Sequence, residues 1–349
     1  MKQFDFVILG FGIAGATITR ELAQRGARIL VIDSGEKTAT AIAGGTIHPA
    51  VLRYYNKVWR ADEFWPIAKS FYQSWERELQ VSLIKSKGLV RIFDSADEPN
   101  QWKEKRKDAF WQQYLRPLTE EQAEDLSQIN APYGYGSIED FWRFDPAFLL
   151  STYRNKLKET EQYITARLSF DSQEALYRQI AALGYKTERI VLAQGHQQDF
   201  WPGLIHGSPI QAKQGQYVII ECPGLKLTRV LKSKFFVIPL GADRYQVGAT
   251  YPRAQEQSDI EKTQKRVFSD LDTFLELPYR IIDYWTGTRP VTKDRKPILG
   301  AFDQTAKICV FNGLNSRGLL MAPLLSFWLA DFMLENKVLP PEVSINRFF

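Results

Sequence analysis

Three glycines and one carboxylate near the start of the chain have the types and spacing to hold a dinucleotide. Gly10, Gly12 and Gly15 follow an almost wholly apolar run, Phe4–Leu9, typical of a strand buried on both faces. This spacing fits a strand-to-helix turn whose backbone lies against a pyrophosphate and lets the next helix pack closely. Asp33 ends a second apolar run 21 residues after Gly12, where a carboxylate would accept hydrogen bonds from ribose hydroxyls. The order of elements predicts dinucleotide binding and leaves FAD and a nicotinamide both open.

Three later segments could bring backbone close to a flat ring. The run 43–49 is rich in small residues, and the apolar run 189–195 also ends in small ones. The loop 312–318 precedes an apolar stretch that predicts a helix from Leu319 to Asn336. The free amides and positive dipole end of that helix would point at whatever the loop contacts.

Periodicity and turn signals predict an α/β protein with a second, largely antiparallel lobe. Asp145 and Pro146 are a plausible N-cap and first position of a helix, and further helices are expected at 59–79, 97–128 and 258–276. Strands are expected at 88–93, as a pair at 163–168 and 189–195, and at 216–221, 235–239, 244–250 and 308–311. We therefore expect a Rossmann-type cofactor domain made of 1–80, 145–205 and 285–349. A substrate domain with a mixed, largely antiparallel sheet would comprise 81–144 and 206–284.

Composition narrows the class of protein. The 349 residues are 44% hydrophobic and 24% charged, as in an ordinary globular protein, and the net charge of +5 permits RNA as a partner without arguing for it. No DNA partner is expected. Cys222 and Cys309 are the two cysteines and lie in no Cys/His cluster, so neither a metal site nor a disulfide is expected. Residues 1–3 lead straight into the first strand, so no signal peptide is expected. The longest apolar stretch, Gly318–Ala330, has 13 residues, fewer than the roughly 20 of a membrane span. These features predict a cytoplasmic protein without a membrane span.

One basic cluster is a candidate nucleic-acid patch. It comprises Lys103, Lys105, Arg106 and Lys107, with aromatic residues on either side. Charge runs on helices ordinarily face solvent, so a solvated helix face whose aromatics pack on the core is the favoured interpretation.

Taken together, these motifs resemble the D-amino-acid oxidase-like family of FAD enzymes, which includes glycine oxidase and sarcosine oxidase. The resemblance rests on the glycine turn with Asp33 and on the segments 191–195, 247–250, 287–297 and 313–323. Within the family, the segments 45–49, 248–251 and 315–325 look most like the FAD domain of the bifunctional tRNA (methylaminomethyl)uridine biosynthesis enzyme. The resemblance implies FAD rather than NAD, because a nicotinamide dehydrogenase has no reason for the C-terminal flavin loop.

The family's hydride transfer from an amine carbon to flavin implies three catalytic candidates. Arg289 would hold a substrate carboxylate as a fork of donors, or else form a salt bridge to Asp294 or another acid. His48 could hydrogen-bond the flavin or the substrate, and Tyr251 could line the substrate cavity, although each could equally be structural.

The resemblance also implies a set of flavin contacts. Arg317 and the amides after it would lie by the flavin pyrimidine, where reduction places negative charge. The whole implied set is Gly10, Gly12, Ile13, Ala14, Gly15, Asp33, Ser34, Gly44, Gly45, Thr46, Arg167, Ala193, Gly195, Gly287, Asn315, Ser316, Arg317, Gly318 and Leu319. Gly287 stands where sarcosine oxidase carries its covalent flavin cysteine, so FAD should be noncovalent. The lysine that sarcosine oxidase uses for oxygen aligns to Gln246, which leaves another electron acceptor open.

Three functions follow as hypotheses. The first is oxidation of the CH–NH bond of a small amino acid or N-substituted glycine. The second is oxidative removal of a carboxymethyl group from a tRNA wobble uridine, which would need a continuous basic surface between the Lys103–Lys107 cluster and the cavity. The third is a noncatalytic flavoprotein subunit. The oligomeric state is left open.

Overall fold

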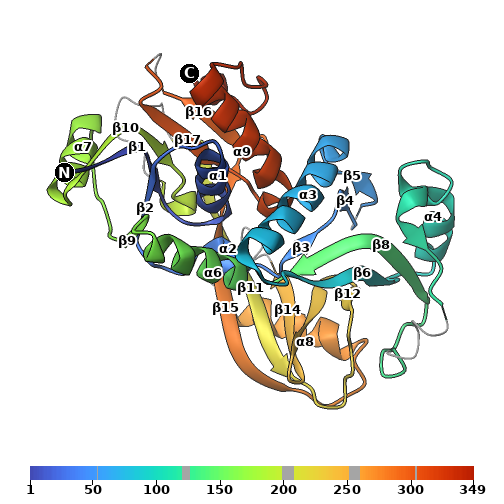
Figure 1. Cartoon of the computed structure of the whole chain (residues 1–349). Helices are drawn as coiled ribbons and strands as arrows, with labels where there is room; N and C mark the ends of the chain where they lie inside the picture. The colour runs from blue at the N-terminus through green and yellow to red at the C-terminus, as the bar shows by residue number, and fades with distance from the viewer. Residues whose placement is uncertain (53, 120–125, 199–207, 251–259, 303–304) are drawn as a thin grey trace.

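The computed structural model describes residues 1–52, 54–119, 126–198, 208–250, 260–302 and 305–349, and these form two large sheets (Figure 1). The first sheet has six strands in the order β16 (Ile298–Ala301), β17 (Ile308–Asn312), β10 (Tyr185–Leu192), β1 (Lys2–Leu9), β2 (Ile29–Asp33) and β9 (Tyr163–Thr165). β1 runs parallel to both of its neighbours, β10 and β2. The predicted first strand is therefore central, which explains why its residues are apolar on both faces.

Helices cover both faces of the first sheet. α1 (Ile13–Gln24) and α9 (Gly318–Glu335) pack side by side on one face, where Phe6, Ile8 and Val31 join their core. α7 (Gln173–Ala182) covers the other face through Leu176 and Ile180. The sequence did not predict α7. The helix predicted after the glycine turn is α1, and the predicted start of α9 at Leu319 is confirmed to within a residue.

One helix of the described residues, α9, has the length and composition of a membrane span. Its 18 residues exceed the 13-residue apolar stretch seen in the sequence. It packs against α1 and α3 (Ala61–Leu79), and 56% of it is buried inside the protein. This burial is that of a core helix of a folded domain.

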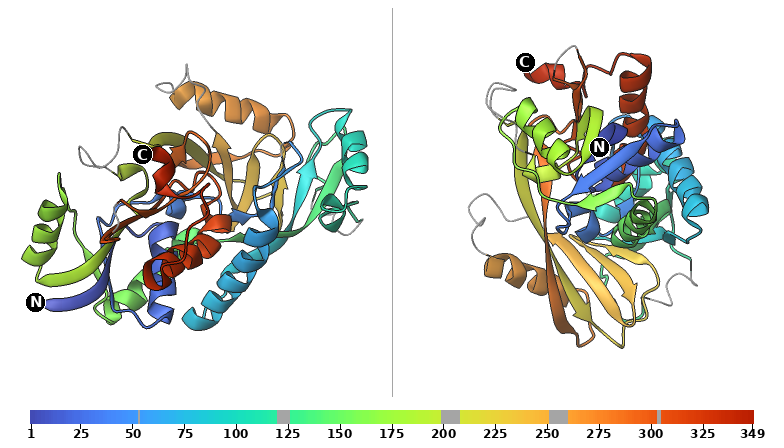
Figure 2. Two further views of the ribbon diagram at one scale, coloured as in Figure 1. Left: turned by 90° about the horizontal axis from the view of Figure 1, so that it is seen from above. Right: turned by 60° about the vertical axis from the view of Figure 1, so that its left-hand side comes forward.

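The second sheet is curved and lies beside the first (Figure 2). Its strand order is β15 (Arg280–Thr292), β11 (Ile210–Glu221), β14 (Arg244–Thr250), β13 (Phe236–Gly241), β12 (Val230–Lys232), β6 (Ile84–Ile92), β8 (Tyr135–Phe144) and β3 (Thr46–Ile47), with β7 (Leu115–Arg116) beside β8. Most neighbours are antiparallel, as expected, and α8 (Ile260–Asp272) packs on the outer face through Val267 and Leu271. The division of the chain into two domains stays a prediction, and β15 of this sheet crosses its expected boundary at residue 285.

The described structure contains further helices, turns and a strand pair outside the two large sheets. They are α2 (Ala39–Ile42), α4 (Glu98–Lys105), α6 (Pro146–Glu159), the strand pair β4 (Ala50–Val51) and β5 (Asn56–Lys57), and single 3₁₀ turns at Trp111–Gln113, Gly195–Gln197 and Ile345–Phe348. The predicted cap of α6 is confirmed, because the carboxylate of Asp145 accepts a hydrogen bond from the Phe148 amide at 3.0 Å.

Three expectations about elements were wrong. Within the described parts of the charged region, 97–119 and 126–128, there is one short α-helix, Glu98–Lys105, followed by a 3₁₀ turn and a two-residue strand, and 120–125 lie outside the described residues. Strands β9 and β10 do not pair with each other, because β2 and β1 lie between them. Gly88 does not start a strand but lies inside β6, with φ +103° at a shift of register against β8.

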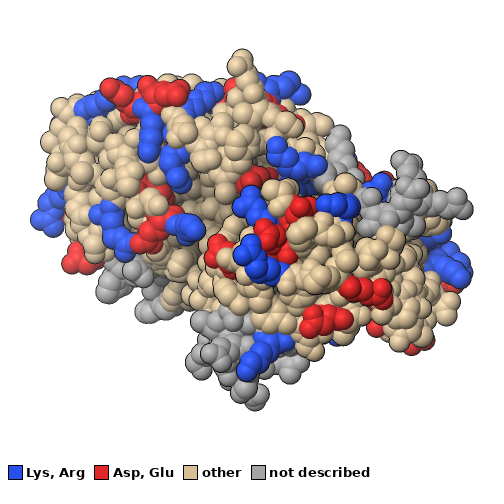
Figure 3. Space-filling model, turned by 90° about the horizontal axis from the view of Figure 1, so that it is seen from below, with Lys and Arg blue, Asp and Glu red and all other residues tan. Residues whose placement is uncertain are grey.

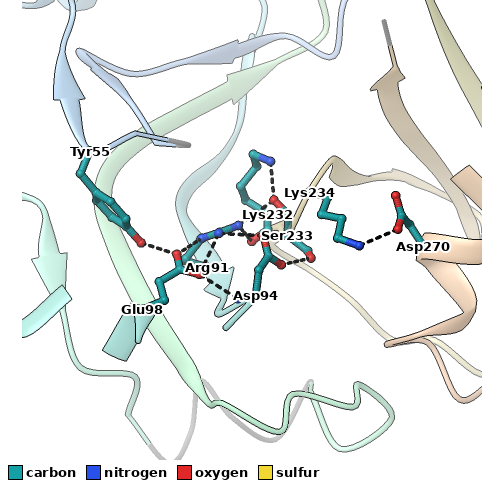
Figure 4. Close-up of polar contacts among 8 residues, drawn as sticks. All are labelled: Tyr55, Arg91, Asp94, Glu98, Lys232, Ser233, Lys234 and Asp270. Carbon is teal, nitrogen blue, oxygen red and sulfur yellow. Dashed lines mark hydrogen bonds and ion pairs between the residues drawn. The ribbon is translucent and has the colours of Figure 1, made fainter. Parts of the chain in front are cut away.

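A buried ion network joins β6, α4 and the end of β12 (Figure 4). The Arg91 guanidinium donates to Glu98 at 2.7 Å, to Asp94 at 2.9 Å and to the Ser233 carbonyl at 2.6 Å. Tyr55 donates its hydroxyl to Glu98 at 2.5 Å. Burial lowers the pKa of Arg91, but its hydrogen bonds to Glu98 and the charges of Asp94 and Glu98 outweigh burial and raise that pKa. The network fixes the strand β12, whose Lys232 lines the cavity described next.

Candidate functional site

A cavity of about 720 Å³ lies between the two sheets. It is lined by the turn after β1, the segment 34–48, residues 166–170 and 193–197, the inner face of the second sheet and the start of α9. This volume lies within the roughly 300–1,000 Å³ of ligand sites in proteins. Segments far apart in the sequence therefore meet at one place.

The glycine turn forms one end of the cavity. A Cβ on Gly15 would lie 2.0 Å from the Gly10 carbonyl oxygen, and a Cβ on Gly10 would lie 2.5 Å from the Ala193 carbonyl oxygen. Side chains at these positions would therefore push α1 away from the sheet. No side chain caps α1 at Gly12, although the Ile13 amide donates to Thr40 Oγ1 at 3.0 Å. A helix start of this kind favours a bound anion.

Asp33 lines the cavity at the end of β2, as its position in the sequence predicts. Its carboxylate accepts hydrogen bonds at 2.9 Å from the Phe11 amide, the Gly35 amide and the Tyr163 hydroxyl. Burial, followed by the Asp33 charge, raises the pKa of Tyr163 above its usual value. A carboxylate offers about four acceptor positions, so one remains for a hydroxyl group of a ligand.

The segment Ile42–Thr46 forms the wall toward the second sheet. A Cβ on Gly44 would lie 2.3 Å from Ile238 of β13, and one on Gly45 would lie 1.7 Å from the Phe144 carbonyl oxygen. Gln246, the residue aligned with the lysine that sarcosine oxidase uses for oxygen, donates its side-chain amide to the Ile42 carbonyl at 2.9 Å. This hydrogen bond fixes the Gln246 side chain against the segment Ile42–Thr46.

Arg289 reaches the cavity from β15. Gly215 of β11 lies beside it, and a Cβ there would come within 2.3 Å of Arg289 Nη1. The glycine thus leaves the space that the guanidinium fills. Asp294, named as an alternative partner of Arg289, forms an ion pair with Arg347 at 2.8 Å, and the role of Arg289 stays a prediction.

His48 lies in the same cavity and is almost wholly buried, at 3% exposure. Nδ1 accepts a hydrogen bond from the Ala50 amide at 3.2 Å, so the ring proton lies on Nε2. Nε2 is buried and has no hydrogen-bond partner in the described structure. Burial, with the charge of Arg317, lowers the pKa of His48 to about 3. His48 is therefore a neutral N–H donor that a ligand could satisfy.

The C-terminal loop closes the cavity where α9 begins. Asn315 Oδ1 accepts from the Thr292 amide at 3.2 Å, and Asn315 Nδ2 donates to the Gly313 carbonyl at 2.6 Å. No side chain caps α9, whose N-cap is Arg317. Its first amides and the Arg317 guanidinium therefore offer positive charge at the cavity wall.

The structure brings together almost all of the predicted site residues. Gly15 lies outside the cavity lining and acts through close packing, and Tyr251 lies outside the described residues. Arg167 lines the cavity but also pairs with Glu36 at the surface. Sequence reasoning missed Thr40, Phe141, Tyr217, Lys232 and Ile238. Alternation along β11 and β13 could have indicated Tyr217 and Ile238, whereas nothing in the sequence marks Lys232.

The basic cluster lies away from the cavity. None of Lys103, Lys105, Arg106 and Lys107 lines it, and Figure 1 places α4 at the outer end of the second sheet. Trp102 of α4 packs its ring on Gly136 inside the protein. On the face shown in Figure 3, basic and acidic side chains are interspersed. Within the described residues, no three His, Cys, Asp or Glu side chains gather as a metal site requires.

Comparison with known proteins gives related enzymes. The chain is similar to glycine oxidase of Bacillus licheniformis, at 25% identity over 97% of this chain and 95% of that protein. It is also similar to the tRNA 5-methylaminomethyl-2-thiouridine biosynthesis bifunctional protein MnmC of Hahella chejuensis, at 22% identity over 99% of this chain but 60% of that protein. The crystal structure of glycine oxidase from Bacillus cereus ATCC 14579 has the same fold, with a TM-score of 0.75, 17% identity and 96% of each chain covered.

A family match extends over nearly the whole chain. Residues 5–332 match DAO, described as FAD dependent oxidoreductase. The matched range includes the glycine turn, Arg289 and the C-terminal loop that meet at the cavity. The chain therefore belongs to the DAO family of FAD-dependent oxidoreductases.

Proposed function

We propose that this FAD-dependent oxidoreductase oxidises the CH–NH bond of a small amino acid or N-substituted glycine. The observation that carries the proposal is the meeting of Arg289, the glycine turn and the start of α9 in one cavity. The similarity to glycine oxidases over almost the full length of both chains supports the same substrate class. A cytoplasmic location remains a prediction from the sequence.

The residues of the cavity fit FAD. The close-packed glycines leave backbone exposed for a pyrophosphate, Asp33 keeps an acceptor position, and His48 presents an unsatisfied N–H. No cysteine lines the cavity, and Gly287 does, which supports noncovalent binding. We propose that Asp33 holds the ribose and that the amides after Arg317 face the pyrimidine ring.

Bound FAD would supply the acceptor for the hydride that leaves the carbon next to the amine, which yields an imine that water hydrolyses. Arg289 would bind the substrate carboxylate through paired N–H donors and so fix which carbon faces the acceptor. Arg317 and the α9 amides would stabilise the negative charge that reduction brings. A neutral amine would need no general base from the protein.

One observation supports the alternative hypothesis, that the enzyme acts on a tRNA wobble uridine: the similarity to MnmC. Its expected basic surface between the cavity and the Lys103–Lys107 cluster has no support, because the cluster lies at the end of α4 and in the two residues after it, outside the cavity lining. The small amine is therefore the better-supported substrate. Loss of flavin absorbance on anaerobic addition of glycine or sarcosine to the purified enzyme tests the proposal.

A further inference from the structure

A second cavity, of about 670 Å³, opens beside the first. Arg143 at the end of β8 lines it, together with Lys85, Arg244 and Trp285. We call it the Arg143 cavity. It is linked to the first cavity through the wall segment, because Thr46 pairs with Arg143 and the Phe144 amide donates to the Gly45 carbonyl at 3.1 Å.

Arg143 is a buried cation without an ion-pair or hydrogen-bond partner for its guanidinium among the described residues. It is 8% exposed, its Nε is buried without a hydrogen-bond acceptor, and it makes no ion pair within the described structure. Arg91, which is 5% exposed, contrasts with it because Glu98, Asp94 and two carbonyl oxygens satisfy its guanidinium. Burying an uncompensated charge costs several kcal/mol, and arginine does not lose its proton to avoid this cost. A ligand that supplies an acceptor would remove the cost.

The nearby carboxylates are already engaged. The negative charge of Asp145 lowers the free-energy cost of burying the Arg143 guanidinium. A carboxylate oxygen of Asp145 nevertheless accepts a hydrogen bond from the Phe148 amide and so caps α6. Asp283 accepts from the Trp285 indole N–H and from the Tyr284 amide, both at 2.7 Å. Burial lowers the pKa of Arg143, and the charge of Asp145 offsets part of that shift.

The remaining lining suits an anion with an apolar body. Lys85 and Arg244 add two exposed cations at the rim, so the cavity holds three cations against two carboxylates. Asp283 fixes the half-buried indole of Trp285, and Ile282, Pro239 and Leu240 extend the apolar surface beside it. Rigid aromatic surface next to a guanidinium is a common way to bind a flat acid.

We propose that the Arg143 cavity binds a small organic anion, a carboxylate or a phosphate ester, whose acid group meets Arg143 and whose apolar part lies against Trp285. This site is separate from the one that holds FAD and the amine. Because Thr46, which lines the first cavity, pairs with Arg143 in the sheet, occupancy of the Arg143 cavity would also stiffen the segment that faces the first cavity.

The test measures binding to the FAD-loaded enzyme by calorimetry and by thermal unfolding. Phenyl phosphate and benzoate are the probes, with sodium chloride holding the ionic strength constant. We expect at least one probe to bind and to raise Tm, and Arg143→Gln to weaken that probe at least about thirtyfold. Without a probe, Arg143→Gln should unfold at the same temperature as the wild type or a higher one, because the variant buries no uncompensated charge.

Two further variants separate this site from general effects of charge. Arg280→Gln removes a surface arginine of the same sheet that pairs with Glu221, and it should leave binding unchanged. Arg244→Gln removes a rim cation and should weaken binding about two- to fivefold without affecting the fold. Failure of both probes to bind the wild type, undiminished binding by Arg143→Gln, or equal effects of the Arg244 and Arg280 variants would each overturn the proposal.

Discussion

Arg289 is the side chain on which substrate capture should depend. It enters the cavity beside Gly215, and its alternative partner Asp294 is engaged with Arg347. Arg289→Ala should keep FAD bound and lower the kcat/KM for flavin reduction by the equivalent of about 2–5 kcal/mol, since it leaves a carboxylate without its buried partner. Stopped-flow reduction under anaerobic conditions measures the loss, and flavin absorbance measures the FAD content.

The lysine variant at the same position adds a matched control. Arg289→Lys keeps the positive charge but loses the paired donors, so it should recover part of the rate and no more. Equal rates for the wild type and Arg289→Ala would remove Arg289 from substrate binding.

Protonation of His48 should make the free energy of unfolding depend on pH below about 6.5. Its pKa of about 3 in the folded protein is below the ordinary 6.5, so the unfolded chain binds the proton more tightly. The contribution of His48 is fully present above about pH 6.5. It is lost by up to about 1.4 kcal/mol per pH unit as pH falls toward 3.

Urea unfolding of wild type and His48→Gln between pH 4 and 8 measures this contribution. The difference in unfolding free energy between the two should change below pH 6.5 and stay flat above it. A difference that is constant throughout would show that His48 titrates normally in the folded protein.

At the scale of elements, the glycine turn allows a test that separates packing from cofactor contact. A Cβ on Gly15 meets the Gly10 carbonyl oxygen at 2.0 Å, whereas one on Gly12 has its nearest neighbour, Thr40 Oγ1, at 3.5 Å. Gly15→Ala should therefore lower the unfolding free energy of the apoprotein by about 1–3 kcal/mol. Gly12→Ala should leave apoprotein stability nearly unchanged and weaken FAD binding, because the added methyl group faces the expected pyrophosphate.

Denaturation of the apoproteins and FAD titration by fluorescence quenching provide the two readouts. Unimpaired FAD binding by Gly12→Ala would place the pyrophosphate elsewhere.

Sequence patterns predicted elements well where local signals agree with burial. The stretch 4–33 combines apolar strands, turn glycines and a helical repeat, and the structure follows it closely. The helix prediction for 97–128 rested on charged composition. It failed in the described residues after Lys105, where Trp111 lies in a 3₁₀ turn and packs its ring on that of Tyr55, 5.7 Å away between the centroids. Helix α7 was missed because its buried residues are only Leu176 and Ile180. Two apolar positions are too few to show a helical repeat in the sequence.

At the scale of the whole molecule, the Arg91 network ties α4 to the strand that carries Lys232. Arg91→Met leaves Glu98 buried at 6% exposure without its partner, so it should lower the unfolding free energy by about 3–5 kcal/mol. The double variant Arg91→Met, Glu98→Gln should recover much of that loss, because the one carboxylate of the network that stays charged, Asp94, is exposed to solvent. Urea unfolding of the wild type, the two single variants and the double variant measures the coupling free energy between Arg91 and Glu98. If the losses of the two single variants add up to the loss of the double variant, the two residues do not form a shared network.

The convergence of segments on the two cavities could not be predicted from local patterns alone. Gly10, Arg289 and Asn315 were found because each lies in a motif, but their meeting depends on strands that cross between distant parts of the chain. Arg143 and Lys232 look like ordinary strand cations in the sequence, and only the fold gives them cavities to line.

Anaerobic reduction of the bound flavin tests the central claim most directly. The purified enzyme is mixed with glycine, sarcosine, proline, several D-amino acids or tRNA bearing carboxymethylaminomethyl-uridine, and flavin absorbance is followed, with Arg289→Ala as the control. The account predicts bleaching by at least one small amine and a much slower reaction in the variant. Bleaching by the tRNA alone, or by none of these compounds, would contradict it.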